Sequence, residues 1–316
     1  RRFRVIMPPV MTADTLNRLK ALIAAIFWGV SFVATKAALR DVSPWTLIVV
    51  RFAFGVAILV FAAWRLHLIK LVSARDFFSL AILGAIAIAI HQGLQATGLT
   101  LTSASSMAWL VGLTPVFTAI LAWLFLHERF GSLKVFGLAI AFAGAIVVVT
   151  KGVLSPETLR LPSTFGDLLA LASSLNWAIF SIASKPLLRR LPPTLMMAYV
   201  MVIGWILIVP FWGIGQGWNE IGNLTTTGWL AITFLGICCS GIAYIFWYDA
   251  LAHIDASEVS AFIYLEPLVT VVVAGIVLGE PFTLVTFLGG LTILFGVYLV
   301  NRPAKGAASE VAIAGE

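Results

Sequence analysis

The sequence predicts an all-α integral membrane protein with ten transmembrane helices, arranged as two inverted repeats of five helices. Three observations lead to this fold class. Of the 316 residues, 61% are hydrophobic and only 11% are charged, whereas about 25% are charged in a typical soluble domain. The apolar residues are grouped in long runs, and the second part of the chain repeats the first. We therefore expect a chain that lies largely within a lipid bilayer.

The apolar runs are long enough for membrane-spanning helices, because one crossing takes about 20 apolar residues. We expect the first run to be an uncleaved span rather than a signal peptide, since it is long and no small-residue cleavage site follows it cleanly. The predicted spans lie near residues 19–38, 45–64, 76–97, 104–126, 133–150, 166–186, 194–214, 228–250, 257–278 and 283–300.

Basic residues are distributed unequally between the two ends of these spans. The Lys and Arg residues of the N-terminal segment, of the loops after spans 2, 4 and 6, and of the C-terminal tail all fall on one side. The other side has only Lys36, Arg40, Lys151 and Arg160. Because Lys and Arg are enriched in cytoplasmic loops, we expect both termini in the cytoplasm. The Lys and Arg residues gathered on the cytoplasmic side also explain the net charge of +6, so no nucleic-acid partner is expected.

The second part of the sequence repeats the first at an offset of 152 residues. A shared apolar composition would align many Leu and Ala residues, but it would not align Pro, Glu and two Gly residues at one unbroken offset. An odd number of spans in each repeat makes the second repeat enter the bilayer from the opposite face. Inverted repeats are typical of secondary transporters, whose substrate site lies near the bilayer midplane. The aligned pairs are Pro115 with Pro267, Glu128 with Glu280, Gly137 with Gly289 and Gly144 with Gly296.

These residues resemble the EamA-type family of the drug/metabolite transporter superfamily. The run from Trp28 to Phe32, followed by Lys36, is similar to the first-span signature of that family, and its Pro…Glu…Gly…Gly pattern occurs twice. Lys134 and Thr286 stand where a Gln often precedes the first Gly of the pattern. The resemblance covers about residues 15–302 and implies ten helices, export of small metabolites and no ATP hydrolysis. Within the family, the sequence is similar to exporters of aromatic and neutral amino acids.

The repeat also sets the expected domain organisation. We expect a basic cytoplasmic N-terminus at 1–18, a first EamA-type repeat at 19–150, a connecting loop at 151–165, a second EamA-type repeat at 166–300 and a cytoplasmic tail at 301–316.

Three ionisable residues fall well inside predicted spans, where a charged group is costly unless it is paired or hydrated. Glu266 precedes Pro267, whose missing N–H frees a backbone carbonyl one turn earlier, so this position suits a substrate amine or a proton. The alternative is that Glu266 pairs with Arg51 or His91 as an internal strut. Arg51 fits a structural pairing better. His91, which titrates near neutral pH, fits either proton coupling or ordinary packing.

Polar and aromatic residues recur at helical spacing, which places them on one face of each span. They predict a central cavity walled by spans 1, 3, 4, 6, 8 and 9, with Ser103, Ser106 and Thr114 on the face that span 4 presents to it. Aromatic faces with amide and hydroxyl edges suit an amphipathic solute. The residues predicted to line the pathway are Trp28, Ser31, Gln92, Gln95, Asn176, Trp177, Tyr244, Trp247, Tyr264 and Glu266.

Structural roles compete with several of these assignments. Ser and Thr also permit close helix packing, and Trp residues often form belts at the membrane interface, although Trp28 and Trp177 lie near mid-span. The Gly-containing faces of spans 5 and 10 predict tight helix association. Glu128 and Glu280 are expected to accept N–H bonds at the start of the helix that follows each of them.

The function predicted from these features is secondary transport of small amphipathic metabolites out of the cytoplasm by alternating access. The sequence contains no GxxxxGK[ST] loop, the motif that would indicate an ATP-driven pump. An intramembrane enzyme and a channel are the rival classes, and export of another metabolite or of a cationic drug is the rival within transporters. The few His and Cys residues suggest no metal, haem or other cofactor. We expect the chain to bind a small-molecule substrate and to be surrounded by the lipid bilayer. We also expect it to act as a monomer and to lie in the bacterial inner membrane.

Overall fold

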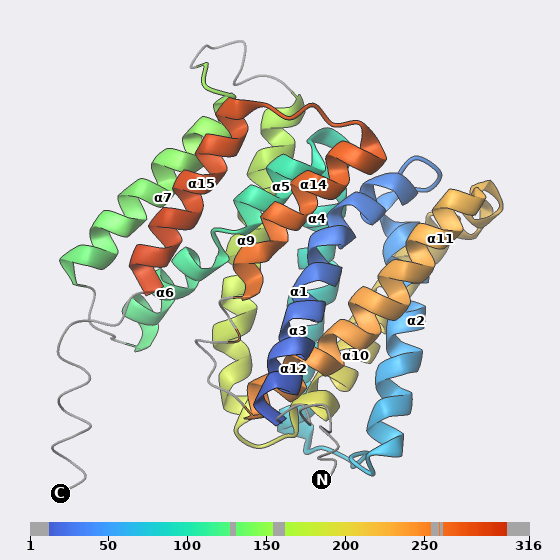
Figure 1. Cartoon of the computed structure of the whole chain (residues 1–316). Coiled ribbons are helices and arrows are strands. Elements are labelled where there is room, and N and C mark those ends of the chain that lie inside the picture. Colours follow the sequence, from blue (N-terminus) through green and yellow to red (C-terminus); the bar gives the residue numbers. More distant parts are fainter. Residues whose placement is uncertain (1–12, 127–130, 154–161, 254–258, 260–261, 302–316) are drawn as a thin grey trace, which may run out of the picture.

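The computed structural model describes residues 13–126, 131–153, 162–253, 259 and 262–301, and the regular elements within these ranges are all helices (Figure 1). The first repeat contains α1 (Ala13–Ala38), α2 (Pro44–Arg65), α3 (Ala74–Gly84), η1 (Ala85–Ile90), α4 (His91–Leu101), α5 (Ala104–Val111), α6 (Thr114–Leu126) and α7 (Ser132–Thr150). The second contains α9 (Pro162–Leu188), α10 (Pro193–Ile214), η2 (Gly217–Asn223), α11 (Thr226–Phe234), η3 (Leu235–Ile242), α12 (Ala243–His253), η4 (Phe262–Leu265), α14 (Glu266–Leu278) and α15 (Leu284–Asn301).

The membrane-spanning character of the chain is confirmed. Eight helical stretches among the described residues are long and apolar enough to cross a bilayer, and they begin with α1 and end with the continuous α11–η3–α12. Two shorter apolar helices follow, Phe262–Leu278 and Leu284–Val300. These stretches coincide with the predicted spans, while the count of ten crossings stays a prediction.

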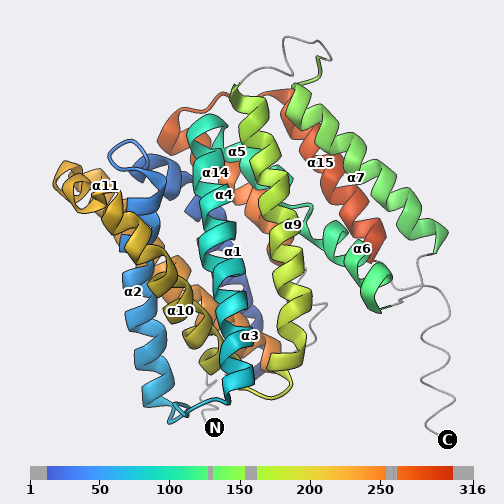
Figure 2. The ribbon, with the colours of Figure 1, turned by 180° about the vertical axis from the view of Figure 1, so that it is seen from behind.

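Helices of one repeat pack against helices of the other in equivalent ways. α1 packs on α12, and its counterpart α9 packs on α4; α2 packs on η3, and its counterpart α10 packs on η1. The last long helices of the two repeats, α7 and α15, lie side by side and run in opposite directions (Figures 1 and 2). The hydrophobic core therefore lies between the repeats as well as within them.

A π-helical segment interrupts the third span of each repeat at equivalent positions. In the first repeat the His91 N–H donates to the Ile86 carbonyl, and in the second the Ala243 N–H donates to the Cys238 carbonyl. Both bonds join residues five apart, and both pairs are related by the offset of 152 residues seen in the sequence. Short π-helical segments inside α-helices are frequent at functional sites.

The predicted small-residue faces of α7 and α15 meet. A Cβ atom added at Gly144 would lie 2.7 Å from the Gly289 carbonyl oxygen, and one added at Gly137 would lie 2.8 Å from the Gly296 carbonyl oxygen. Neither approach leaves room for a side chain, so the tight association expected for spans 5 and 10 is confirmed.

Glu280 caps a helix, as predicted, but not the helix that follows it. Its carboxylate accepts hydrogen bonds from the backbone N–H groups of Ala104 (2.8 Å) and Ser105 (3.2 Å), which begin α5 in the first repeat. The expectation that Glu280 caps α15 is therefore wrong, because the packing of α14 on α5 brings the α5 N-terminus to the end of α14. Glu128, its counterpart, lies outside the described residues.

Candidate substrate site

Arg51 from α2 is the buried cation of the candidate site, with only 5% of its surface exposed. Its Nε donates to the Ser240 hydroxyl at 2.8 Å, and its Nη1 donates to the Gln92 side-chain oxygen at 3.3 Å. These partners come from η3 and α4, so the guanidinium connects the two π-containing spans. Its partners are neutral, and among the described residues no carboxylate forms an ion pair with it.

His91 lies one residue before Gln92 and faces α9 instead. Its Nδ1 is 3.1 Å from the Ser173 carbonyl oxygen, which makes Nδ1 the donor in this contact. Its ring centroid is 4.8 Å from that of Trp177, and Trp177 in turn lies 4.9 Å from the ring of Phe180. This arrangement fits a packed histidine with a fixed ring orientation, and it places the predicted residues Trp177 and His91 in direct contact.

A second aromatic cluster forms around Trp28 on α1. Its ring centroid is 5.6 Å from Tyr244 and 5.1 Å from Trp247, both on α12. The Trp28 Nε1 donates to the Cys239 carbonyl at 3.1 Å, where the π-helical turn gives access to the backbone. The Ser31 hydroxyl donates to the Trp28 carbonyl at 2.6 Å, within its own helix. The predicted residues Trp28, Tyr244 and Trp247 are thus brought together.

Glu266 begins α14 and is only 9% exposed. Among the described residues its carboxylate has no ion-pair or hydrogen-bond partner, so the structure does not place it in a strut with Arg51 or His91. The backbone around it is tightly fixed. The Thr270 hydroxyl lies 2.7 Å from the Gly29 carbonyl oxygen and 2.8 Å from the Glu266 carbonyl oxygen.

Thr114 stands in the first repeat at the position equivalent to Glu266, so the two repeats can be compared at this point. Pro115 has no N–H, so the Val111 carbonyl four residues earlier loses its helical partner. The Thr114 hydroxyl donates to that carbonyl at 2.8 Å, and the Ser174 hydroxyl of α9 lies 3.4 Å from it. The first repeat therefore closes its proline break with two hydroxyls, whereas the second places a carboxylate beside Pro267.

Sequence reasoning missed Val111 and Ser174 as members of this arrangement. The signal that could have found Thr114 as the counterpart of Glu266 is the 152-residue offset, which aligns the residues before the two prolines. No sequence pattern marks Ser174, because its role depends on how α9 packs against α5 and α6.

The remaining predicted residues have separate surroundings. Gln95 is buried on α4, and the Oδ1 atom of Asn176 on α9 is buried with no hydrogen-bond partner among the residues that the structure describes. Tyr264 lies in η4 and packs against a different hydrophobic cluster, around Trp109 and Ile293. Ser103 and Ser106 line a pocket near the start of α5, away from the predicted central face. Among the described residues, no group of three or more His, Cys, Asp or Glu residues could hold a metal ion.

Comparison with known proteins assigns the chain to a protein family. The model of the EamA-like transporter family matches residues 18–150 and again residues 164–302. The chain belongs to the EamA-like transporter family. The two matches cover most of the chain, and together they confirm the resemblance that the Trp28 run and the repeated Pro…Glu…Gly…Gly pattern suggested.

Relatives in this EamA family are named as transporters. An uncharacterized transporter of Archaeoglobus fulgidus is 28% identical over 289 residues, covering 91% of this chain and 98% of the relative. A second one from the same organism is 31% identical over 281 residues, covering 87% and 95%. A probable terminal-alkyne amino-acid exporter of Streptantibioticus cattleyicolor is 26% identical over 294 residues, covering 93% and 96%.

A solved crystal structure has the same fold. It matches with a TM-score of 0.62 at 18% sequence identity and covers 90% of this chain and 96% of its own. Family and fold together show a multi-pass membrane transporter of the EamA family, with relatives in bacteria and archaea.

Proposed function

We propose that this chain is a secondary transporter that exports small amphipathic metabolites from the cytoplasm, with aromatic or neutral amino acids as its preferred cargo. The observation that carries the proposal is Glu266, a buried carboxylate without a partner among the described residues, located where α1 packs on α14. An ionisable group inside a membrane span marks a substrate or ion pathway by default.

The chemistry around Glu266 suits an ammonium group next to an apolar body. With respect to the described residues the carboxylate is a free acceptor, while the buried cation Arg51 is engaged by Ser240 and Gln92. Trp28 lies on the same helix as Gly29, whose carbonyl contacts Thr270 beside Glu266. Aromatic faces attract ammonium groups and stack on flat side chains. The relative named as a probable amino-acid exporter supports this class of cargo.

The two repeats support alternating access as the mechanism. Their equivalent helices make equivalent contacts, and α7 and α15 run in opposite directions, as expected for inverted repeats. Rocking of one repeat against the other would expose a site between them to either side in turn. We place both termini in the cytoplasm and the protein in the bacterial inner membrane, acting as a monomer on a small molecule.

A panel of substrates in proteoliposomes tests this function. Purified protein is reconstituted, and uptake of amino acids is measured with and without a pH gradient. We expect saturable uptake of an aromatic amino acid such as phenylalanine. Phenylethylamine, which keeps the ammonium and ring but lacks the carboxylate, separates amino-acid export from export of organic cations in general.

Two variants test the assigned site. Glu266→Gln and Trp28→Ala are each expected to reduce uptake by tenfold or more, since each removes an interaction of about 1.5 kcal/mol or more with the charged group. Trp229→Ala on the exposed surface of α11 and Asp14→Asn at the exposed start of α1 are the matched controls. Full uptake by both site variants would show that the site is assigned wrongly.

A further inference from the structure

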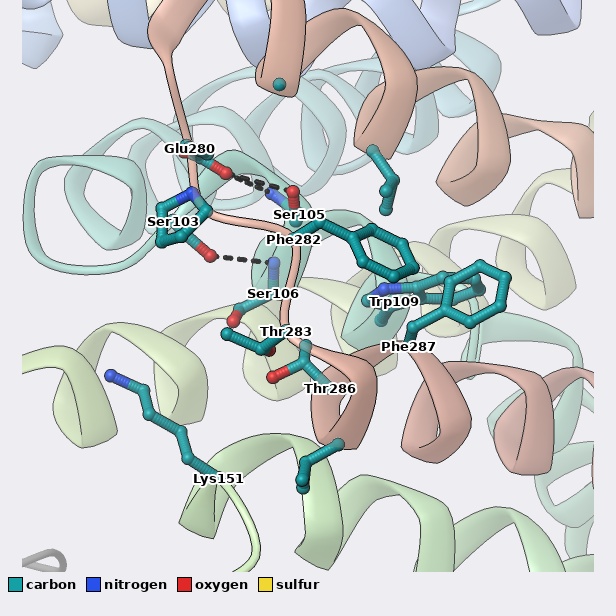
Figure 3. A pocket seen from close by; sticks show the side chains of 14 residues that line it. Ser103, Ser105, Ser106, Trp109, Lys151, Glu280, Phe282, Thr283, Thr286 and Phe287 are labelled. Atoms are coloured by element: carbon teal, nitrogen blue, oxygen red, sulfur yellow. Dashed lines mark hydrogen bonds between the residues drawn. The ribbon is translucent and has the colours of Figure 1, made fainter.

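A pocket of about 380 Å³ lies at one end of the helix bundle, away from the candidate substrate site (Figure 3). It is formed where the starts of α5 and α15 meet the ends of α7 and α14, and we call it the α5–α15 pocket. Its size is within the usual range of small-molecule sites, about 300–1,000 Å³. The lining residues used below are Ser106, Trp109, Lys151, Phe282, Val285 and Thr286.

Trp109 contributes an unsatisfied hydrogen-bond donor to this pocket. Its side chain is fully buried, its ring packs against Gly290, and its Nε1 has no hydrogen-bond partner among the described residues. Figure 3 shows the indole nitrogen on the side of the ring that faces Ser106 and Thr286. An indole N–H donates and never accepts, and a buried donor without a partner is rare. The pocket therefore offers a fixed donor to an acceptor atom.

The charged groups of the pocket differ in how far they are already bound within the chain. Glu280 is occupied, because Ala104 N, Ser105 N and the Ser105 hydroxyl (2.9 Å) all donate to it. The ammonium of Lys151 lies 3.4 Å from the Ser163 hydroxyl and has no acidic group within 4.0 Å among the residues described. An ammonium, an indole N–H and hydroxyl groups together suit an anionic oxygen group.

The rim of the pocket is apolar and exposed. Phe282 and Val285 both line it, yet they are 63% and 44% exposed. In a chain that spans a membrane, exposed apolar side chains on the outside of the helices face the lipid. The pocket also lies at the helix ends, the level at which lipid headgroups and the amphipathic side chains of Lys residues are found.

We propose that the α5–α15 pocket binds the phosphate headgroup of an anionic membrane lipid. The phosphate oxygens accept from Trp109 Nε1, from the Thr286 and Ser106 hydroxyls, and from Lys151. The acyl chains leave past Phe282 and Val285 along the outer surfaces of α14 and α15. The proposal is independent of the transported substrate.

Native mass spectrometry of the detergent-solubilised full chain tests this binding. Phosphatidylglycerol and phosphatidylcholine are titrated separately. We expect one phosphatidylglycerol to bind at least tenfold more tightly than phosphatidylcholine. Trp109→Phe keeps a ring against Gly290 and removes the N–H, and it is expected to weaken phosphatidylglycerol binding about tenfold. Lys151→Gln is expected to weaken it about threefold, since that side chain is exposed.

Matched controls separate the pocket from general effects. Trp229→Phe removes an indole N–H from the exposed face of α11, and Lys185→Gln removes an exposed cation from α9; neither is expected to change lipid binding. If Trp109→Phe does not fold, Thr286→Val, which replaces a hydroxyl by a methyl of the same shape, gives the same test.

Two outcomes overturn the proposal. The first is equal binding of the two lipids by the unaltered chain, or unchanged binding in the pocket variants. The second is displacement of phosphatidylglycerol by a soluble anion, either inorganic phosphate or indole-3-acetate, at millimolar concentration. That result would assign the pocket to a soluble anionic ligand instead of a lipid.

Discussion

Within the described part of the chain, Arg51 is a buried cation held by two neutral side chains and by no acid. An arginine has five N–H donors in a rigid fork, so it can hold Ser240 and Gln92 on different helices at once. A lysine has a single ammonium on a flexible stem and does not reproduce this geometry. The residue type at position 51 is therefore set by the need to reach two elements.

Arg51→Lys is expected to lower the free energy of unfolding by about 2 kcal/mol, because one or both buried hydrogen bonds to a charged group are lost. Thermal unfolding in a single detergent measures this change. Arg65→Lys, at the exposed end of the same helix, is the control and is expected to change it by less than about 0.5 kcal/mol. Equal effects of the two substitutions would contradict the structural role of Arg51.

Residue-scale predictions from the sequence succeeded where a single span decides the outcome. Glu266, His91 and Arg51 were expected inside spans, and each is buried. The sequence did not predict which of them would meet, because that depends on the packing of helices distant in the chain. His91 contacts Ser173 and Arg51 contacts Ser240, although the sequence suggested either as a partner of Glu266.

At the scale of helices, α7 and α15 are held together by a contact between their backbones. Gly144 has the Gly289 carbonyl oxygen and the Ile293 nitrogen, both backbone atoms, within 2.7 Å of where its Cβ would be. A flexible side chain could move aside for an added methyl group, but two helix backbones move only by separating. This pair therefore depends on glycine more than on apolar character.

Gly144→Ala is expected to lower the free energy of unfolding by about 1–3 kcal/mol through overpacking, as measured by thermal unfolding. Gly131→Ala provides the comparison in the same helix region, since no atom of the described residues lies within 4 Å of an added Cβ there. A Gly144→Ala protein as stable as Gly131→Ala would refute the close approach of α7 and α15.

Glu220 connects η2 to the start of α2, outside the spanning segments. Burial raises the pKa of its carboxyl, but hydrogen bonds from the Ser43 N–H (2.8 Å) and from the Ser43 and Thr46 hydroxyls outweigh that effect and hold the pKa below its usual value of 4.5. A carboxyl with a lowered folded-state pKa stabilises the fold above its unfolded pKa, and this contribution is lost as the pH falls through the folded value.

The stability difference between the unaltered chain and Glu220→Gln is therefore expected to be constant at neutral pH and to disappear below about pH 4.5. Its size is small, since the group is largely hydrated. Melting temperatures measured from pH 7 to pH 3.5 show the trend. A difference that persists at the lowest pH would mean that the substitution acts through packing rather than through charge.

The helices themselves were predictable because apolar run length determines where a chain can span. Their internal breaks were not. Nothing in the run from Ala85 to Ile90 distinguishes a π-helical turn from an α-helical one, because the apolar pattern is continuous through it. The break before Thr114 was foreseeable from Pro115, since proline removes a fixed backbone donor.

At the scale of the whole molecule, the two ends of α2 provide a test of orientation. Asn219 lies in η2, next to the Glu220 that bonds to Ser43 at the start of α2, whereas Lys70 follows the end of α2. These two positions are therefore at opposite ends of the bundle, and the charge distribution predicts that Lys70 lies on the cytoplasmic side.

Single cysteines at these positions report the orientation in a chain whose native Cys238 and Cys239 are replaced by Ala. We expect Asn219→Cys to react with a membrane-impermeant maleimide in intact cells and Lys70→Cys to react only after the cells are permeabilised. The parent lacking both native cysteines is the control for background labelling. The opposite pattern would place the termini outside the cytoplasm.

Contacts between the repeats are what the sequence alone could not provide. The duplication predicted that equivalent helices exist, but not that Glu280 would cap α5 across the molecule or that Trp109 would turn its N–H into a pocket beside α15. Both depend on which surfaces of the two repeats meet. The contacts of α1 with α12 and of α9 with α4 are equivalent, so the two repeats meet through matching pairs of helices.

The π-helical turns of η1 and η3 also affect the direction in which the side chains after them point. One residue corresponds to about 100° of rotation around a helix axis, and a π-type turn accommodates one more residue than an α-type turn. If the η1 turn became α-helical with no residue removed, His91 and Gln92 would rotate by about 100° away from Ser173 and Arg51. Deleting Ala87 would instead restore a regular α-helix and leave both side chains facing these partners. The same conversion of η3 would turn Tyr244 and Trp247 away from Trp28, so the π-helical turn of each repeat sets the direction in which the side chains after it point.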